Sequence, residues 1–181
     1  VADIRAVTAR MDTTGVTDVV VVGGGFIGLE TAENLRKAGK HVTVIEGTDQ
    51  VMAPFDEDMA QILHKELIDN GIDLYLSTTV TEIGKDTIAA VREGKSLMLP
   101  AQAVVMSVGV RPETGLARDC GLETGETGGI KVNHNYQTTD PDIYAVGDVI
   151  ESYNALTHRP GRLALAGPAQ RQARAAADHI Y

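Results

Sequence analysis

Hydrophobic and polar residues alternate with two different periods along the first half of the chain. The apolar run 19–22 predicts a buried strand, and the helical spacing of apolar residues over 27–38 predicts a helix that Gly39 terminates. A second strand is predicted at 41–46, in the sequence HVTVIE. The order of strand, helix and strand predicts a unit with parallel strands.

The alternation of predicted strands and helices continues to residue 76. Residues 47–54 predict a loop, after which Asp56 is placed to cap a second helix. Asn70 and Gly71 end this helix, and alternation over 72–76 predicts a third strand. The inward face of the second helix is expected to carry Met59, Ile62, Leu63 and Leu67. We therefore predict an α/β fold of the Rossmann-like, doubly wound parallel kind.

The pattern changes after residue 80. Short strands are predicted at 80–83, 87–91 and 96–99, which indicates an antiparallel β-meander crossover instead of a further helix. The apolar stretch 103–107 predicts a strand in the middle of the parallel sheet. A brief strand is predicted later, at 143–145.

Both ends of the chain are predicted to be helical. Apolar residues over 4–11 have helical spacing, and residues 12–15 supply a turn. The C-terminal helix is predicted from about Gly167, with Pro168 in its first turn. Because the chain begins with Val inside a helical pattern, we expect it to be part of a longer protein.

Three glycines follow the first predicted strand in the order G-x-G-x-x-G. Gly23 allows a tight turn, Gly25 lets the backbone approach a pyrophosphate, and Gly28 lets the helix pack closely on the strand. The N–H groups and the dipole of the helix N-terminus favour an anion there. Glu46 lies 18 positions after Gly28, where a carboxylate meets ribose hydroxyls in dinucleotide sites. These residues predict a dinucleotide-binding site.

Two alternatives fit the glycine pattern taken alone. It is also typical of ordinary turns, with Glu46 as a solvated strand end, and of methyltransferases that bind S-adenosylmethionine. As a dinucleotide site it favours NADH over NADPH, because Glu46 would repel a 2′-phosphate and residues 47–49 offer no Arg to receive it.

Charge and composition limit the possible partners. The 181 residues include 16 Lys and Arg against 25 Asp and Glu, a net charge of -9 without a basic cluster, which argues against nucleic acid and anionic membranes. Cofactor phosphates must therefore be held mainly by backbone amides. The chain contains neither a membrane-length apolar run nor the layout of a signal peptide at its start, so we expect a cytoplasmic protein.

Cysteine and histidine form no recognisable catalytic or metal cluster in the sequence. Cys120 is the single cysteine, which we interpret as a structural thiol that acts as a small hydrophobic residue. The acids at 56–58 are interpreted as helix-capping and dipole residues. The five histidines lack metal-site spacing: His41, His64, His134, His158 and His179. We assign no catalytic residue and no metal ligand.

Three later motifs resemble the pyridine nucleotide-disulfide oxidoreductases. They are VVMSVGVRPET at 104–114, TTDPDIYAVGD at 138–148 and LAGPAQRQAR at 165–174. The resemblance runs along nearly the whole chain. Within the family, the chain is most similar to the branch of coenzyme A-disulfide reductase and NADH oxidase. It implies an NAD(H)-binding domain at 1–111, with an N-terminal helix and linker at 1–16. Residues 112–181 would then be the C-terminal part of an FAD-binding domain.

The resemblance also implies roles for individual residues. The glycine turn and Glu46 would bind NAD, while Glu30 and the backbone near Gly109 would lie by the nicotinamide half. Asp148 would hydrogen-bond the FAD ribitol, and the start of the last helix would point at the flavin. The implied cofactor-binding residues are Gly23, Gly25, Phe26, Ile27, Gly28, Glu30, Glu46, Gly109, Gly147, Asp148 and Ala166.

The implied function is an oxidoreductase that delivers hydride from NADH to FAD, for reduction of a disulfide, polysulfide, peroxide or oxygen. The family's FAD-pyrophosphate glycines and redox cysteine would precede Val1, so we expect the isolated chain to be inactive, to bind little FAD and to leave apolar surface uncovered. The full-length protein would be a homodimer. Gln170 and Ala173 depart from the Asn and Gly common in the family. The alternative function is a non-catalytic NAD-binding module or sensor subunit.

Overall fold

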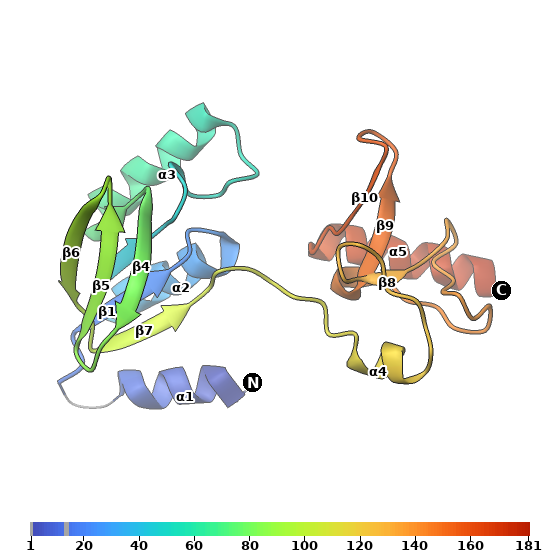
Figure 1. Ribbon diagram of the computed structural model, residues 1–181, viewed down its shortest axis with the longest axis horizontal. Helices are drawn as coiled ribbons and strands as arrows, with labels where there is room; N and C mark the ends of the chain where they lie inside the picture. The colour runs from blue at the N-terminus through green and yellow to red at the C-terminus, as the bar shows by residue number, and fades with distance from the viewer. Residues whose placement is uncertain (1, 13–14) are drawn as a thin grey trace. The chain divides into compact units, whose positions relative to one another are not determined.

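The computed structural model describes residues 2–12 and 15–181. The chain forms two compact units, Val1–Gly109 and Val110–Tyr181 (Figure 1). The first helix is present as α1 (Ala2–Met11). Val1 and two residues of the predicted turn, Thr13 and Thr14, lie outside the described residues.

A four-stranded parallel sheet with the order β3-β2-β1-β7 forms the centre of the first unit. Its strands are β1 (Asp18–Val22), β2 (His41–Ile45), β3 (Ile72–Tyr75) and β7 (Ala103–Met106). The predicted α/β fold with its parallel sheet and β-meander is confirmed.

The predicted central place of the strand at 103–107 is wrong. Within the described part of the chain, β7 pairs only with β1, so it forms an edge of the sheet. After β3 the chain leaves the sheet for the meander and returns on the free side of β1, where Met106 stays exposed. An apolar run is therefore compatible with an edge strand that is covered on its faces.

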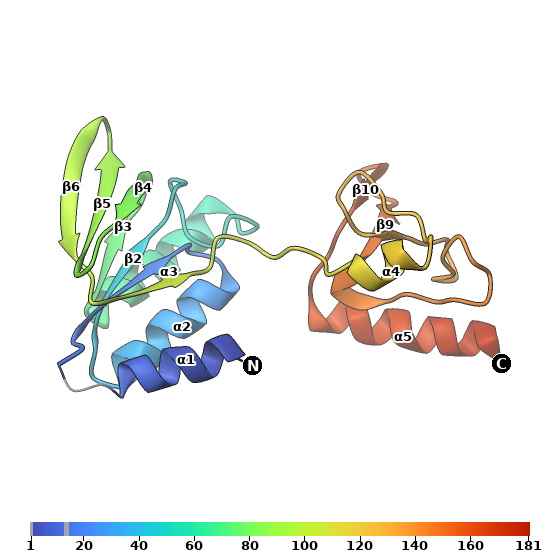
Figure 2. The same ribbon diagram turned by 60° about the horizontal axis from the view of Figure 1, so that its bottom comes forward.

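Both faces of the sheet are buried, and alternate valines of β1 serve the two sides. Val19 and Val21 belong to the cluster that includes residues of α2 (Phe26–Lys37) and α3 (Glu57–Asp69). Val20 and Val22 belong to the cluster on the other side, with Ile88 of the meander. Figure 2 shows α1 and α2 on one face and the meander on the other. The uninterrupted valine run follows from this two-sided burial.

The meander consists of β4 (Thr78–Ile83), β5 (Thr87–Arg92) and β6 (Lys95–Pro100), paired antiparallel in that order. It covers the face of the sheet where a doubly wound domain would carry helices. The predicted meander is confirmed.

The predicted inward face of α3 is confirmed at Leu63 and Leu67 and wrong at Met59 and Ile62. Asp56 is the N-cap residue, yet its side chain makes no capping hydrogen bond within the described part of the chain. Ala60, His64 and Leu67 are buried, whereas Met59 and Ile62 are 51% and 62% exposed. The small side chain at Ala60 permits close packing, so the stripe through residues 60, 64 and 67 faces inward.

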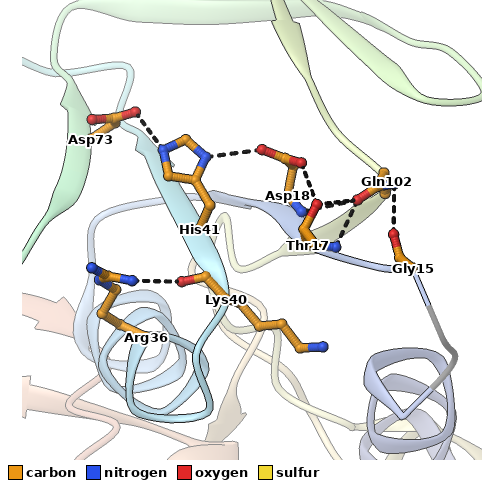
Figure 3. Close-up of polar contacts among 8 residues, drawn as sticks. All are labelled: Gly15, Thr17, Asp18, Arg36, Lys40, His41, Asp73 and Gln102. Carbon is orange, nitrogen blue, oxygen red and sulfur yellow. Dashed lines mark hydrogen bonds and ion pairs between the residues drawn. The ribbon is translucent and has the colours of Figure 1, made fainter.

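Polar contacts around His41 connect the strands at their amino-terminal ends (Figure 3). Its Nδ1 lies 3.0 Å from Asp18 Oδ1 and its Nε2 lies 3.2 Å from Asp73 Oδ2, which joins the starts of β1, β2 and β3. A hydrogen bond from the Thr17 hydroxyl, together with the hydrogen bond and charge of His41, lowers the pKa of Asp18 against the opposing effect of burial. Gln102 Oε1 accepts from the amides of Thr17 and Asp18.

The second unit contains a three-stranded sheet and a long helix. Its elements are α4 (Gly115–Asp119), β8 (Ile130–Lys131), the 3₁₀ helix η1 (Gly147–Val149), β9 (Ile150–Asn154), β10 (Arg159–Gly161) and α5 (Ala166–Ile180). The sheet order is β10-β9-β8. The predicted C-terminal helix is confirmed, and Pro168 lies in its first turn.

The predicted strand at 143–145 is wrong. Tyr144 forms an isolated bridge with Gln137, and Ile143 N–H closes a turn onto the Asp140 carbonyl. The chain then enters η1 directly, which leaves too few extended residues for a ladder.

The glycines of residues 125–129 form a turn. Gly125 N–H donates to the Gly129 carbonyl at 2.8 Å. The buried carboxylate of Glu151 accepts hydrogen bonds from Thr127 N–H and Oγ1, both at 2.6 Å. A Cβ at Gly125 would overlap this carboxylate, so the turn requires glycine there.

Candidate functional site

The predicted glycine turn lies at the carboxyl edge of the sheet, between the ends of β1, β2 and β7. Gly23 N–H donates to the Ile45 carbonyl at 2.8 Å, and Ser107 N–H donates to the Val22 carbonyl at 2.8 Å. From β1 the chain crosses to β2 on one side, while β7 lies on the other side. Open parallel sheets bind ligands in the crevice at such a switch point.

The three motif glycines have three different surroundings. Gly23 has a φ of +107°, and a Cβ there would overlap the Ser107 carbonyl. A Cβ at Gly28 would overlap the Gly23 carbonyl and approach Ser107 Oγ to 2.8 Å. A Cβ at Gly25 would meet no described atom within 4 Å. Gly23 and Gly28 therefore serve the turn and the close helix packing, while Gly25 leaves space open for a ligand.

Helix α2 presents backbone N–H groups at this edge. Its N-cap is Gly25, and its first intrahelical bond is donated by Leu29 to the Gly25 carbonyl at 3.0 Å. The amides of residues 26–28 therefore point out of the helix start, and none of the side chains in that turn is acidic. This end of the helix suits an anion.

Two large apolar side chains flank these amides. Phe26 and Ile27, two of the residues implied to bind the cofactor, are both exposed. Phe26 makes an edge-to-face contact with Phe55, with 6.3 Å between ring centroids. Both residues lie in the first turn of α2.

Glu46 is fixed against the glycine turn. Its Oε2 accepts from Gly24 N–H at 2.7 Å, and its Oε1 accepts from the amide and hydroxyl of Thr48 at 2.8 and 2.9 Å. Burial acts to raise the pKa of Glu46, but hydrogen bonds from Thr48, Gly24 and Gly47 outweigh it and lower the pKa below its ordinary value. The side chain is therefore a carboxylate at neutral pH. Each carboxylate oxygen accepts up to two hydrogen bonds, so Oε2 can receive one more.

The loop between β2 and α3, predicted only as a connection, forms a wall of the same site. Met52 N–H donates to the Gly24 carbonyl at 2.9 Å, and a Cβ at Gly24 would lie 2.9 Å from Val51 Cγ1. His64 Nε2 accepts from Val51 N–H at 3.0 Å. The only sequence signal was the apolar pair Val51 and Met52 inside a predicted loop.

Two other predicted residues of the first unit lie elsewhere. Glu30 is exposed and lines a groove between α2 and α3, together with Leu63 and Glu66. Gly109 follows β7 with a φ of +124° and is exposed at the end of the first unit. The glycine turn and Glu46 are thus brought together, whereas Glu30 is placed on a helix flank.

The predicted residues of the second unit gather around the start of α5. η1, which contains Gly147 and Asp148, lies against α5. Gly147 has a φ of +81° and donates its N–H to Gln172 Oε1 at 2.7 Å. Asp148 is exposed, and the first α5 hydrogen bond leads from Ala169 N–H to the Leu165 carbonyl. Gln172, a buried residue of the LAGPAQRQAR motif, was not predicted.

Cys120 does not pack as the small hydrophobic residue that was expected. Cys120 is exposed at the C-terminal end of α4, because the helix ends there against Gly121. Over residues 2–12 and 15–181, no group of three His, Cys, Asp or Glu residues lies close enough to hold a metal ion. Among the helices that the structure describes, none is long and apolar enough to cross a membrane.

Comparison with known proteins gives consistent results. Residues 3–173 match the sequence profile described as pyridine nucleotide-disulphide oxidoreductase. The chain is 35% identical over 180 residues to a CoA-dependent NAD(P)H sulfur oxidoreductase of Pyrococcus abyssi and 38% identical over 183 residues to an NADH oxidase of Methanocaldococcus jannaschii. These matches cover 98% and 99% of this chain, and the chain spans 40% of each relative.

A solved structure leads to the same family. The reduced Bacillus anthracis CoADR-RHD matches with a TM-score of 0.88 and 37% identity, over 99% of this chain and 32% of that chain. Proteins of the family use FAD and a pyridine nucleotide. The relatives carry the names of the branch that the motifs indicated. The chain therefore belongs to the pyridine nucleotide-disulphide oxidoreductase family.

Proposed function

We propose that the first unit is an NAD(H)-binding domain, at 1–111, and that residues 112–181 form the C-terminal part of an FAD-binding domain. The chain would then serve an NADH-dependent flavoprotein oxidoreductase. The observation that carries this proposal is an ionised Glu46 fixed beside a glycine turn whose outer side is open at Gly25. The family membership of the chain supports it.

The residues at the turn fit a dinucleotide. Amides of residues 26–28 and the helix dipole receive the pyrophosphate, which suits a chain with a net charge of -9. Gly25 lets the backbone come close to it, and Glu46 Oε2 accepts a hydrogen bond from an adenosine ribose hydroxyl. Phe26 and Ile27 line the path from the pyrophosphate toward the nicotinamide half. We place Glu30 and Gly109 on that side by resemblance to the family.

The second unit supplies a matching set for FAD. The Asp148 carboxylate accepts from a ribityl hydroxyl, while Gly147 is held in place by Gln172. The N–H groups at Ala166 and Gly167 favour negative charge on the flavin ring. When bound, NADH supplies hydride and FAD passes the electrons to an acceptor.

The charge of Glu46 selects NADH. A 2′-phosphate near this carboxylate would face a like charge. At a separation of about 4 Å, the repulsion between two like unit charges is about 1 kcal/mol in bulk water and about 4 kcal/mol near a protein surface. This corresponds to an affinity difference of about fivefold or more.

Titration of the 181-residue chain with NADH and NADPH by calorimetry tests the proposal. NADH is expected to bind more tightly by about fivefold or more. Glu46→Gln keeps the size of the side chain but removes its charge, and should narrow the difference. Glu82→Gln, on the exposed strand β4, is the matched control and should change neither affinity. Failure to bind either nucleotide, or tighter binding of NADPH, would overturn the assignment.

For a protein in which this chain is one part, we propose a cytoplasmic homodimer that reduces a disulfide, polysulfide, peroxide or oxygen. The names of the relatives support a sulfur compound and oxygen as first choices. Consumption of NADH by the FAD-containing protein with coenzyme A disulfide, polysulfide, peroxide and oxygen in turn distinguishes the acceptors. Failure of all four would contradict this part of the proposal.

A further inference from the structure

His64 connects helix α3 to the wall of the nucleotide site without reaching the site itself. The side chain is buried, at 6% exposure, and its Nε2 accepts from Val51 N–H at 3.0 Å. An accepting Nε2 carries no proton, so the ring N–H lies on Nδ1. Nδ1 lies 3.3 Å from Gln61 Oε1, which can accept that proton in a hydrogen bond. His64 therefore has one defined tautomer and orientation.

The residues that His64 holds contact the glycine turn directly. Val51 is fully buried against Gly24, and Met52 N–H donates to the Gly24 carbonyl at 2.9 Å. Met52 has a φ of +52°, in the left-handed backbone region that residues other than glycine rarely adopt. Such backbone persists where surrounding contacts hold it, and here those contacts flank Met52 on both sides.

Both backbone polar groups of Gly24 are hydrogen-bonded. Its N–H donates to Glu46 Oε2 at 2.7 Å, and its carbonyl accepts from Met52. Because Gly24 lies between Gly23 and Gly25, its orientation sets the direction of the turn that would receive the pyrophosphate. A continuous series of contacts thus leads from His64 through the loop to Gly24 and the ribose-binding carboxylate.

We propose that His64 is a positioning residue for the adenosine and pyrophosphate side of the NADH site. This inference rests on the proposed function of the glycine turn. His64 keeps Val51 and Met52 in place, and they keep Gly24 and Glu46 in the orientation that binds. Loss of the acceptor at Nε2 releases the loop that contains Val51 and Met52. Nucleotide binding must then order this loop, and the free-energy cost of ordering it weakens the affinity.

Three variants separate the hydrogen bond from packing. In His64→Gln the amide oxygen can take the place of Nε2, whereas His64→Asn is too short and His64→Leu has no acceptor. The affinity for NADH is expected to fall about three- to tenfold in the Asn and Leu variants, the range of one net hydrogen bond. The Gln variant should stay within about twofold of the original chain. ADP-ribose affinity should fall by the same factor, because the loop borders the adenosine half.

His41 provides the matched control at the opposite edge of the sheet. His41→Leu breaks the contacts to Asp18 and Asp73, so it should lower the melting temperature and leave NADH affinity unchanged. Equal NADH affinity in all three His64 variants would overturn the inference, as would a Gln variant as weak as the Leu variant. If His64→Leu does not fold, the Asn and Gln variants decide between these outcomes. An original chain that binds neither NADH nor ADP-ribose would instead overturn the proposed function.

Discussion

Alanine substitutions at two glycines of the same turn should have opposite consequences. In Gly28→Ala the new methyl group overlaps the Gly23 carbonyl and comes within 2.8 Å of Ser107 Oγ. The carbonyl belongs to the backbone and cannot rotate away, so α2 must move from β1. Overpacking of this kind costs about 1–3 kcal/mol, and a backbone obstacle favours the upper end. The expected loss in melting temperature is about 10 °C.

Gly25→Ala leaves the fold intact but fills the space for the ligand. Gly25 has a φ of -82°, which alanine adopts without strain, and a Cβ there meets no described atom within 4 Å. The free energy of unfolding should therefore change by less than about 1 kcal/mol, the usual effect of replacing an N-cap glycine. The methyl group points where the pyrophosphate is proposed to lie. NADH affinity should fall about tenfold or more, because steric overlap costs at least about 1–3 kcal/mol.

Urea unfolding and calorimetric titration of both variants test the pair. The unfolding midpoint should shift for Gly28→Ala at an unchanged m-value, which would indicate a loss of stability in a native state of similar compactness. Gly25→Ala should lose NADH binding at an unchanged midpoint. Wild-type affinity in Gly25→Ala, or wild-type stability in Gly28→Ala, would refute the reasoning about the turn.

Three further predictions concern charge and cofactor content. Glu46→Arg should shift the preference toward NADPH in competitive titrations, and an unchanged preference would count against the role of Glu46. Folding lowers the pKa of both Glu46 and Asp18, so their stabilisation is complete above their ordinary values and is lost as the pH falls through the folded values. Urea midpoints should therefore decline below about pH 4.5, and less steeply in a double Glu46→Gln, Asp18→Asn variant than in the original chain. The 181-residue chain should purify without flavin, because its single G-x-G-x-x-G turn is assigned to NADH; a yellow sample with flavin absorbance would contradict this.

Local patterns predicted most elements correctly, because strand and helix periods are properties of neighbouring residues. The valine run, the meander turns and the C-terminal helix were all readable in this way. The failures arose where two local solutions compete. On α3 the stripe through Met59 and Ile62 is the more apolar one, yet packing against the loop and sheet buried Ala60 and His64 instead.

The candidate site shows the same division. Glycine spacing and the position of Glu46 were visible in the sequence, because the turn and the strand end are short, local structures. Three contacts were not visible: Glu46 with Gly24, Met52 with Gly24, and His64 with Val51. Each joins residues 13 or more positions apart, which only the folding of separate segments against one another brings together.

The sequence by itself determined the order of strands and helices in the first unit, the glycine turn and the family of the chain. The tertiary structure decided that β7 is an edge strand, that Cys120 is exposed and that His64 supports the loop beside the turn. The physical reason is that periodicity and backbone freedom are encoded residue by residue. Which faces meet, and which polar atoms find partners, depends on the packing of segments that are distant along the chain.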